Sequence, residues 1–210
     1  MAIRGTDWMR TWAETAEAIR ATRKTSEKAA IVAAYLRDLE PDDLARAAVF
    51  LSGRPFPERD QRKTGLGWAA ISAVAQAVAG ADEGALGRAY DRSSDLGTSV
   101  GELLSEVGHE PARRRRLTLA EVAAGFEALA EAGGRDAKAE IYAELLRQAD
   151  PLSARYVTAI LGGELRIGLR EGHLEKGIAI AFERDLAQVQ CCLLYTSPSP
   201  RDNQPHLVCR

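Results

Sequence analysis

The sequence predicts an all-α fold made of many helices, and three observations support this prediction. The chain of 210 residues is rich in Ala, Leu, Glu and Arg, and aromatic residues make up only 6% of it, which favours helix over sheet. Apolar residues recur at the three- and four-residue spacing of amphipathic helices, and no convincing strand alternation occurs. Two segments of the chain also resemble each other, which divides the predicted helices into two related sets.

The predicted helices follow one another with short breaks. Trp12, Ala16 and Ile19 share one face of a helix near the N-terminus. Pro41 suits the first position of a later helix, because a proline there loses no intrahelical hydrogen bond. Gly53 suits the end of that helix, since glycine readily adopts the left-handed conformation that closes a helix.

Two capping-box patterns predict helix starts in the middle of the chain. Ser99 and Glu102 precede one apolar run, and Thr118 and Glu121 precede another. In such a pattern the hydroxyl and the carboxylate each accept a hydrogen bond from a backbone N–H of the first turn. No helix is assigned between Gly80, which ends an earlier apolar stripe, and Ser99.

An internal repeat is the most informative feature of the chain. Residues 28–54 align without gaps on residues 138–164, and nine of the 27 aligned positions are identical, Lys28 and Lys138 among them. Each copy is predicted to form a helix, a proline-started helix, a glycine, and then a Gly-Leu pair that opens a further helix. The repeat therefore predicts a domain of two related halves.

The two Gly-Leu pairs are Gly65-Leu66 and Gly168-Leu169, and the first copy carries seven extra residues before its pair. We expect one domain over residues 1–190, with pseudo-symmetric halves of about residues 8–110 and 117–190. The alternative is a solenoid of two repeats, although solenoids usually need three or more.

Two loops that combine glycine with cations are the candidate binding site. Glycine lets a backbone approach a ligand closely, and a helix start offers N–H groups to a phosphate. Two phosphate-sized cradles would suit two backbone stretches of a duplex, and such contacts position a protein without reading bases. The alternative is a pair of solvated inter-helix loops. The candidates are Arg54, Arg62, Lys63, Gly65 and Gly67 in the first loop and Gly163, Arg166, Gly168 and Arg170 in the second.

The net charge of the chain limits how it could attract nucleic acid. The net charge of −2 excludes a large basic field, so any contact with DNA must come from local clusters or from backbone amides. The densest positive run is Arg113–Arg116, which is either a further phosphate contact or a solvated segment between the halves.

Several classes of protein and site are not favoured. No apolar run of 18 residues could span a membrane, and the N-terminus lacks a signal-peptide core, so the cytoplasm is the default location. His109 and His173 lie far apart, and neither a HExxH motif nor paired Cys-x-x-Cys motifs occur. The sequence therefore predicts no catalytic residue and no metal site.

The last twenty residues differ from the rest. All three cysteines lie there, and helical periodicity stops near Gln190. The segment Cys192–Asp202 resembles a translated sequencing adapter, so we expect residues 191–210 to be an artefactual, disordered tail. The alternative is a natural disordered tail. Residues 1–190 contain no cysteine, which excludes a disulfide or a thiolate metal site there.

Several motifs, taken together in this order, resemble the N-terminal domain of ATP-dependent DNA ligases of the archaeal and bacterial type. The resemblance covers most of residues 8–185, and one departure from the family pattern is the segment Arg170–His173. The motifs that carry the resemblance are Leu51–Pro57, Gly65–Ala70, Asp95–Gly97, Leu117–Val122, Ala149–Tyr156 and Leu161–Leu169.

The resemblance implies an all-helical, internally pseudo-symmetric domain that binds the minor groove on both sides of a nick in duplex DNA. The parent enzyme would transfer AMP from ATP to a lysine and then to a 5′-phosphate, and would seal the nick with a 3′-hydroxyl, using Mg²⁺. Such enzymes serve DNA repair, replication and recombination.

The lysine that accepts AMP stands in a Lys-x-Asp-Gly motif, which this chain lacks. We therefore expect a non-catalytic monomer that holds no cofactor of its own. The alternative function is a helical-repeat module for protein interaction, which would show a contiguous exposed apolar patch.

Overall fold

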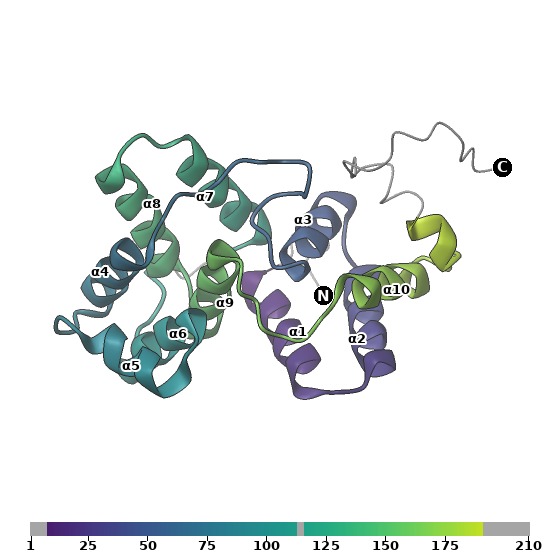
Figure 1. Cartoon of the computed structure of the whole chain (residues 1–210), viewed down its shortest axis with the longest axis horizontal. Helices are drawn as coiled ribbons and strands as arrows, with labels where there is room; N and C mark the ends of the chain where they lie inside the picture. The colour runs from purple at the N-terminus through teal and green to yellow at the C-terminus, as the bar shows by residue number, and fades with distance from the viewer. Residues whose placement is uncertain (1–7, 113–115, 191–210) are drawn as a thin grey trace.

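The computed structural model of the chain describes residues 8–112 and 116–190, and these residues confirm the all-α prediction (Figure 1). The adapter-like tail and Arg113–Arg115 lie outside the described residues. Within the described part, an isolated antiparallel bridge between Trp8 and Thr118 is the only strand-like contact. The helices are α1 (Met9–Ala21), α2 (Thr25–Arg37), α3 (Pro41–Leu51), α4 (Trp68–Ala79), α5 (Ala85–Ser93), α6 (Leu96–Glu106), α7 (Leu119–Glu131), α8 (Arg135–Gln148), α9 (Pro151–Gly162) and α10 (Glu171–Ala181).

Among residues 8–112 and 116–190, none of the helices combines the length and the apolar character that a membrane crossing needs.

Local sequence signals set many of the helix ends. Pro41 is the first residue of α3, as predicted, and Pro151 opens α9 in the same way. Gly53, just after the end of α3, has φ of +80°, which fits its predicted role in closing the helix. The capping box of Thr118 and Glu121 is also confirmed at the start of α7.

The capping box predicted at Ser99 and Glu102 is wrong. Helix α6 already begins at Leu96, because the carboxylate of Asp95 accepts a hydrogen bond from the backbone N–H of Thr98 at 2.6 Å. Ser99 lies inside the helix, where its hydroxyl donates to the carbonyl of Asp95 at 2.7 Å. An aspartate caps a helix as well as a serine does, and the earlier cap fixes the start.

Helix α5 was not predicted, because its sequence carries only weak local helix signals. The helix has only nine residues and contains Gly87, which weakens its local signal. Its start is stabilised from another helix, since the side-chain oxygen of Gln76 accepts hydrogen bonds from the N–H groups of Gly84 and Leu86. A cap supplied from eight or more residues away leaves no local capping pattern.

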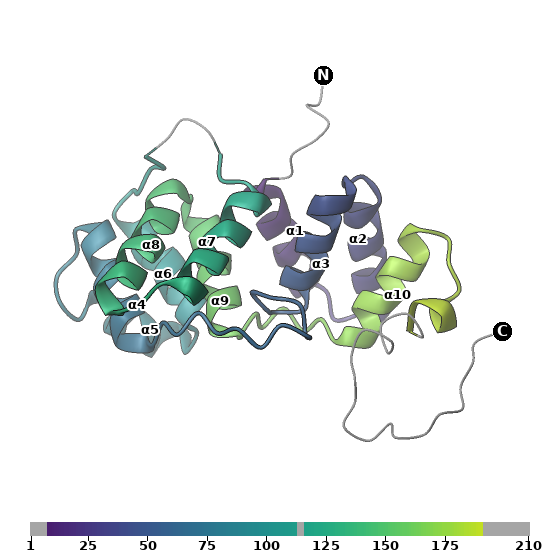
Figure 2. The same ribbon diagram turned by 90° about the horizontal axis from the view of Figure 1, so that it is seen from above.

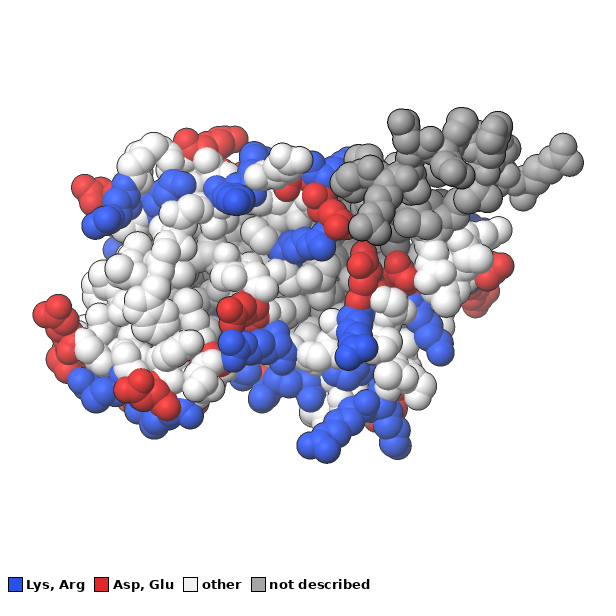
Figure 3. All heavy atoms as spheres, viewed as in Figure 1, with Lys and Arg blue, Asp and Glu red and all other residues white. Residues whose placement is uncertain are grey.

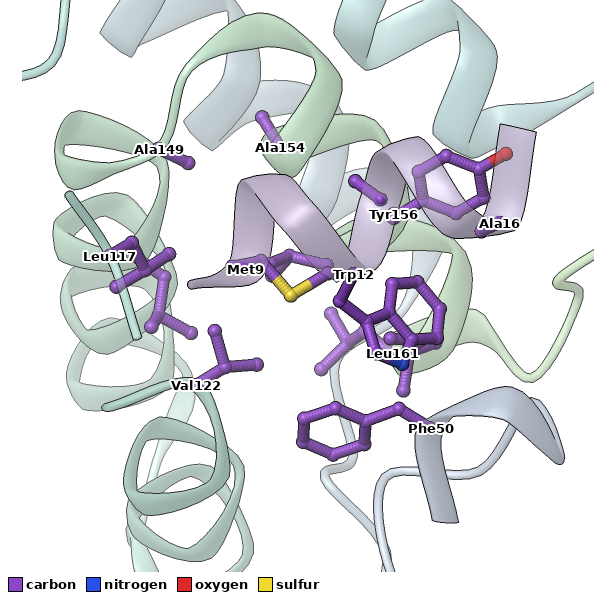
Figure 4. Close-up of a cluster of buried hydrophobic side chains, with 14 of the residues drawn as sticks. Met9, Trp12, Ala16, Phe50, Leu117, Val122, Ala149, Ala154, Tyr156 and Leu161 are labelled. Carbon is purple, nitrogen blue, oxygen red and sulfur yellow. The ribbon is translucent and has the colours of Figure 1, made fainter. Parts of the chain in front are cut away.

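The core centres on Trp12 of α1, which is fully buried (Figure 4). Its ring packs edge-to-face on Phe50 of α3 and on Tyr156 of α9, at centroid distances of 6.4 and 5.6 Å. Phe50 packs in the same manner on Phe126 of α7. The indole N–H donates to the carbonyl of Ala47 at 3.2 Å, so this buried polar group is satisfied. One aromatic cluster thus joins four helices.

The helices that follow the two candidate loops cross between the repeat copies. Helix α4, which follows the first loop, packs on α8 of the second copy. Helix α10, which follows the second loop, packs on α2 of the first copy. Figure 1 shows the result as two groups of helices, with α4 and α8 at one end and α2 and α10 at the other. The pseudo-two-fold relation itself stays a prediction.

Asp150 connects the start of α9 to α1. Its carboxylate caps α9 by accepting from the N–H groups of Leu152 and Ser153, and it also accepts from Arg10 of α1 at 2.7 Å. Burial raises the pKa of Asp150, but the hydrogen bonds from Ser153 and Arg10 outweigh it, so the pKa lies below its ordinary value.

We expect Asp150→Ala to lower the free energy of unfolding by about 1–2 kcal/mol at pH 7, because a cap and an interhelical bond are lost. Urea unfolding measures the change, and Glu83→Ala, an exposed substitution, should change it by less than about 0.5 kcal/mol. Folding lowers the pKa of Asp150 below its unfolded value near 3.8. The stability difference between the wild type and Asp150→Ala should therefore be largest at pH values well above 3.8, and should shrink as the pH falls through the pKa of the folded state. Equal stability of the two variants at pH 7 would contradict this role.

Candidate nucleic-acid interface

The two candidate loops lie along one side of the molecule. The first loop, residues 52–67, joins α3 to α4, and the second loop, residues 163–170, joins α9 to α10. Figure 2 shows both loops running along the same edge, which is the face turned to the viewer in Figure 1. Segments that are about one hundred residues apart in the sequence therefore form one continuous surface.

The loops meet near their starting points. A Cβ placed on Gly53 would lie 3.4 Å from the Cβ of Leu165, so the side chain of Leu165 lies close to the backbone of the first loop there. Arg54 and Arg170 line the same small pocket of about 70 Å³, together with Leu51 and Leu174. The structure thus brings together one predicted cation from each loop.

The two loops repeat the same local pattern ahead of a helix. In each loop a buried residue, Thr64 or Ile167, precedes an exposed glycine. Gly65 and Gly168 have φ of +67° and +63°, in the left-handed region that favours glycine. A helix begins three residues after each glycine. Both loops therefore enter their helices with the same local backbone pattern.

Both helix starts leave N–H groups available to an anion. The residue that precedes α4 is Gly67, which has no side chain, and the residue that precedes α10 is Arg170, whose side chain carries only donors. Neither can accept a hydrogen bond from the first turn. The free N–H groups of the first turn and the helix dipole favour an anion at each position. The start of α4 is the more open of the two, because at α10 the N–H of Arg170 donates to Nδ1 of His173 at 3.4 Å and Glu171 adds a carboxylate to the first turn.

Two of the predicted cations in the first loop have acidic partners. The guanidinium of Arg54 lies 3.2 Å from Glu58. Arg62 forms a two-pronged contact with Asp60 and lies over the ring of Phe56 at 4.8 Å, and its hydrogen bond lowers the pKa of the Asp60 carboxyl. These contacts order the first loop. They are exposed ion pairs, which contribute little stability, so a phosphate can replace the carboxylate at low cost.

Arg166 is tied to a different part of the fold. Its guanidinium donates to the carbonyl of Ser94 at 2.6 Å and contacts Glu164 at 2.6 Å and Asp95 at 3.5 Å. The residue also has φ of +49°, which is unusual for a side chain larger than glycine. Arg166 therefore links the second loop to the start of α6.

The remaining predicted residues are more open. Among the described residues, Lys63 and Arg170 have no ion-pair partner. A Cβ on Gly67 would meet nothing within 4 Å. Gly163, with φ of +71°, closes α9, which by itself accounts for a glycine there.

Two lysines that bind the candidate loops were not predicted as site residues. The ammonium of Lys28 on α2 donates to the carbonyl of Ile167 in the second loop at 2.7 Å. The ammonium of Lys138 on α8 donates to the carbonyl of Thr64 in the first loop, also at 2.7 Å. Burial lowers the pKa of the Lys28 amine. The signal was present in the sequence, because these lysines are one of the identical pairs of the repeat.

Charge on this face is sparse. Figure 3 shows Lys and Arg in small groups, several of them beside Asp or Glu, around a broad uncharged area. Any attraction for an anion must therefore come largely from backbone N–H groups and from the few cations without acidic partners.

Comparison with known proteins identifies the family. The family model described as DNA ligase N terminus matches residues 9–179, which is most of the chain. The chain belongs to the DNA ligase N-terminus family. The matched residues include both candidate loops and all but the last residues of α10.

Proteins described as DNA ligases or probable DNA ligases are similar to this chain. A probable DNA ligase of Koribacter versatilis is 38% identical over 87% of this chain, and one of Opitutus terrae is 34% identical over 83%. A DNA ligase of Methanothermobacter thermautotrophicus is 31% identical over 88% of the chain. The chain spans only 31%, 20% and 34% of these three relatives, respectively.

The loop glycines of this family domain allow a matched test of backbone geometry. A Cβ at position 65 would be strained at φ of +67° and would lie 2.7 Å from the ammonium of Lys138. We expect Gly65→Ser to lower the free energy of unfolding by about 1–2 kcal/mol. Gly67→Ser should keep or raise it, because position 67 is open and serine caps a helix well. Urea unfolding measures the free energy of unfolding of both variants. Equal destabilisation would contradict the left-handed geometry assigned to position 65 and the open geometry assigned to position 67.

Proposed function

We propose that this chain binds nicked duplex DNA, without sequence preference, as the N-terminal module of an ATP-dependent DNA ligase. The observation that supports this function best is the pair of matching loops on one face. Each loop presents an exposed glycine and a helix start suited to a phosphate. Two such positions on one surface fit two stretches of DNA backbone, as binding on both sides of a nick requires.

The chemistry of the face favours contact with the DNA backbone over reading of bases. Backbone N–H groups and arginines are suited to phosphate oxygens, which are the same at every sequence. The proposed contacts are the nine residues predicted from the sequence, with Lys63 and Arg170 as the cations most readily available. Arg54, Arg62 and Arg166 would exchange carboxylate partners for phosphate.

Catalysis is assigned to the parts of the parent ligase that lie outside this region. The chain contains no Lys-x-Asp-Gly motif, and its relatives are about three to five times as long as the region that they share with it. We propose that adenylation, with its ATP and Mg²⁺, belongs to that remainder. The present region, residues 1–190, would act as a cytoplasmic monomer in repair, replication or recombination, with 5′-phosphate and 3′-hydroxyl ends as the substrate of the whole enzyme.

The alternative, a protein-interaction module, gains no support from the described surface. Its exposed large apolar side chains are Trp68, Val107, Ile180 and Phe182. Trp68 begins α4, while Ile180 and Phe182 lie on and just after α10, and Figure 1 shows these helices at opposite ends. They therefore do not form one contiguous patch.

Binding should depend steeply on salt. Because phosphate contacts release counterions, we expect the affinity for a nicked duplex to fall linearly with salt on logarithmic axes, with a slope of about 0.9 per phosphate contacted. Fluorescence anisotropy of a labelled nicked duplex measures this slope. Binding that is insensitive to salt, absent at low salt, or strongly dependent on base sequence would refute the proposal.

A pair of arginine variants tests the position of the interface. Arg170→Ala should weaken binding roughly fivefold at low salt and reduce the salt slope by about one, because a single phosphate contact is lost. Arg147→Ala removes the same charge from the far end of α8, where Arg147 pairs with Glu140 and Glu144. This control should change the affinity less than about twofold. Equal effects of the two variants would mean that the loops are not the interface.

A further inference from the structure

The two lysine contacts connect the repeat copies in a reciprocal manner. Lys28 belongs to the first copy and binds the carbonyl that precedes Gly168 in the second loop. Lys138 occupies the equivalent place in the second copy and binds the carbonyl that precedes Gly65 in the first loop. Each loop is therefore held by the helix of the opposite copy, and both hydrogen bonds measure 2.7 Å.

Peptide geometry links these contacts to the exposed face. A carbonyl and the following N–H belong to one planar trans peptide group and point in opposite directions. Because the carbonyls of Thr64 and Ile167 point inward to a lysine, the N–H groups of Gly65 and Gly168 point outward. Within residues 8–112 and 116–190, neither N–H has an acceptor, although the residue before each is buried.

The missing side chain of each glycine makes room for the lysine. A Cβ on Gly65 would lie 2.7 Å from the ammonium nitrogen of Lys138, and a Cβ on Gly168 would lie 3.0 Å from that of Lys28. These separations are closer than ordinary contact. The left-handed φ therefore favours glycine at each position, and a side chain there would also displace the lysine ammonium behind it.

The lysine charge favours an anion on the outer side of the peptide. Lys28 is only 6% exposed and has no carboxylate partner in the described part of the chain. A cation bound to the carbonyl polarises the peptide group and strengthens its N–H as a donor. The positive charge lies directly behind the loop, where water does not screen it fully.

We propose that Lys28 and Lys138 are positioning residues for DNA binding, each of which holds the loop of the opposite copy so that Gly168 or Gly65 donates its N–H to a phosphodiester oxygen. This inference rests on the proposed function. It adds that the lysine of each copy supports the loop of the other copy, so each half of the domain completes the phosphate site of the other half.

Methionine variants of the full chain test the proposal. Methionine is similar to lysine in length but lacks the donor and the charge. Lys28→Met and Lys138→Met should each weaken binding to a 5′-phosphorylated nicked duplex roughly tenfold at low salt, as measured by fluorescence anisotropy. Lys24→Met is the matched control, because Lys24 lies one turn earlier, next to α2, is largely exposed and pairs with Glu27. It should change the affinity less than about twofold.

Amide NMR separates positioning from simple stability. In the absence of DNA, Lys28→Met should shift the Gly168 amide and leave that of Gly65 unchanged, and Lys138→Met should do the reverse. Lys28→Met should change the melting temperature little, because the removal of a buried charge offsets the loss of the hydrogen bond to the carbonyl of Ile167. Lys138→Arg, which keeps a charged donor, should retain most of the binding.

The outcomes are distinguishable. If the unmodified chain binds no nicked duplex at low salt, the proposed function fails. If it binds and the two methionine variants bind equally well, only the positioning role is overturned. If Lys24→Met weakens binding as much as Lys28→Met does, the effect is one of net charge, and the inference is wrong. If weaker binding is accompanied by melting near the assay temperature and by shifts across the whole amide spectrum, the lysines are structural only and the inference is also wrong.

Discussion

The packing of Trp12 between α3 and α9 is the constraint on which the candidate interface depends. Its ring contacts Phe50 and Tyr156, and its indole N–H binds the carbonyl of Ala47 inside α3. The first loop leaves the end of α3 and the second leaves the end of α9. By joining these two helices in the core, the tryptophan sets the starting points of both loops on one face. A buried apolar contact therefore decides where a polar surface is formed.

The interface is built from backbone geometry more than from charge. The chain carries a net charge of −2, and three of the predicted arginines have carboxylate partners. What the two loops share is a buried residue, a left-handed glycine and a helix start. The crossed lysines hold these elements in place. Such a surface suits a ligand that has the same phosphate spacing at every sequence, which agrees with the family to which the chain belongs.

The parts of the fold that follow from local signals were predictable from the sequence. Pro41 and the capping box at Thr118 depend on neighbours within one helical turn, and the structure has them as predicted. Helix α5 and the lysine contacts depend on partners that lie far away in the sequence, such as Gln76 for α5. The repeat revealed that Lys28 and Lys138 correspond, but their role needs the crossing of α4 and α10 between the copies. The predicted helix start at Ser99 is four residues too late, because the structure caps α6 with Asp95, which was not predicted as a cap.

The central claim is that both loops contact DNA together, as one surface. Hydrogen–deuterium exchange of the full chain, with and without a nicked duplex at low salt, tests this claim most directly. Slower exchange in both loops, residues 52–67 and 163–170, with little change in the exposed turn near Glu83, is the predicted result. Protection of only one loop, or protection confined to other surfaces, would contradict the account.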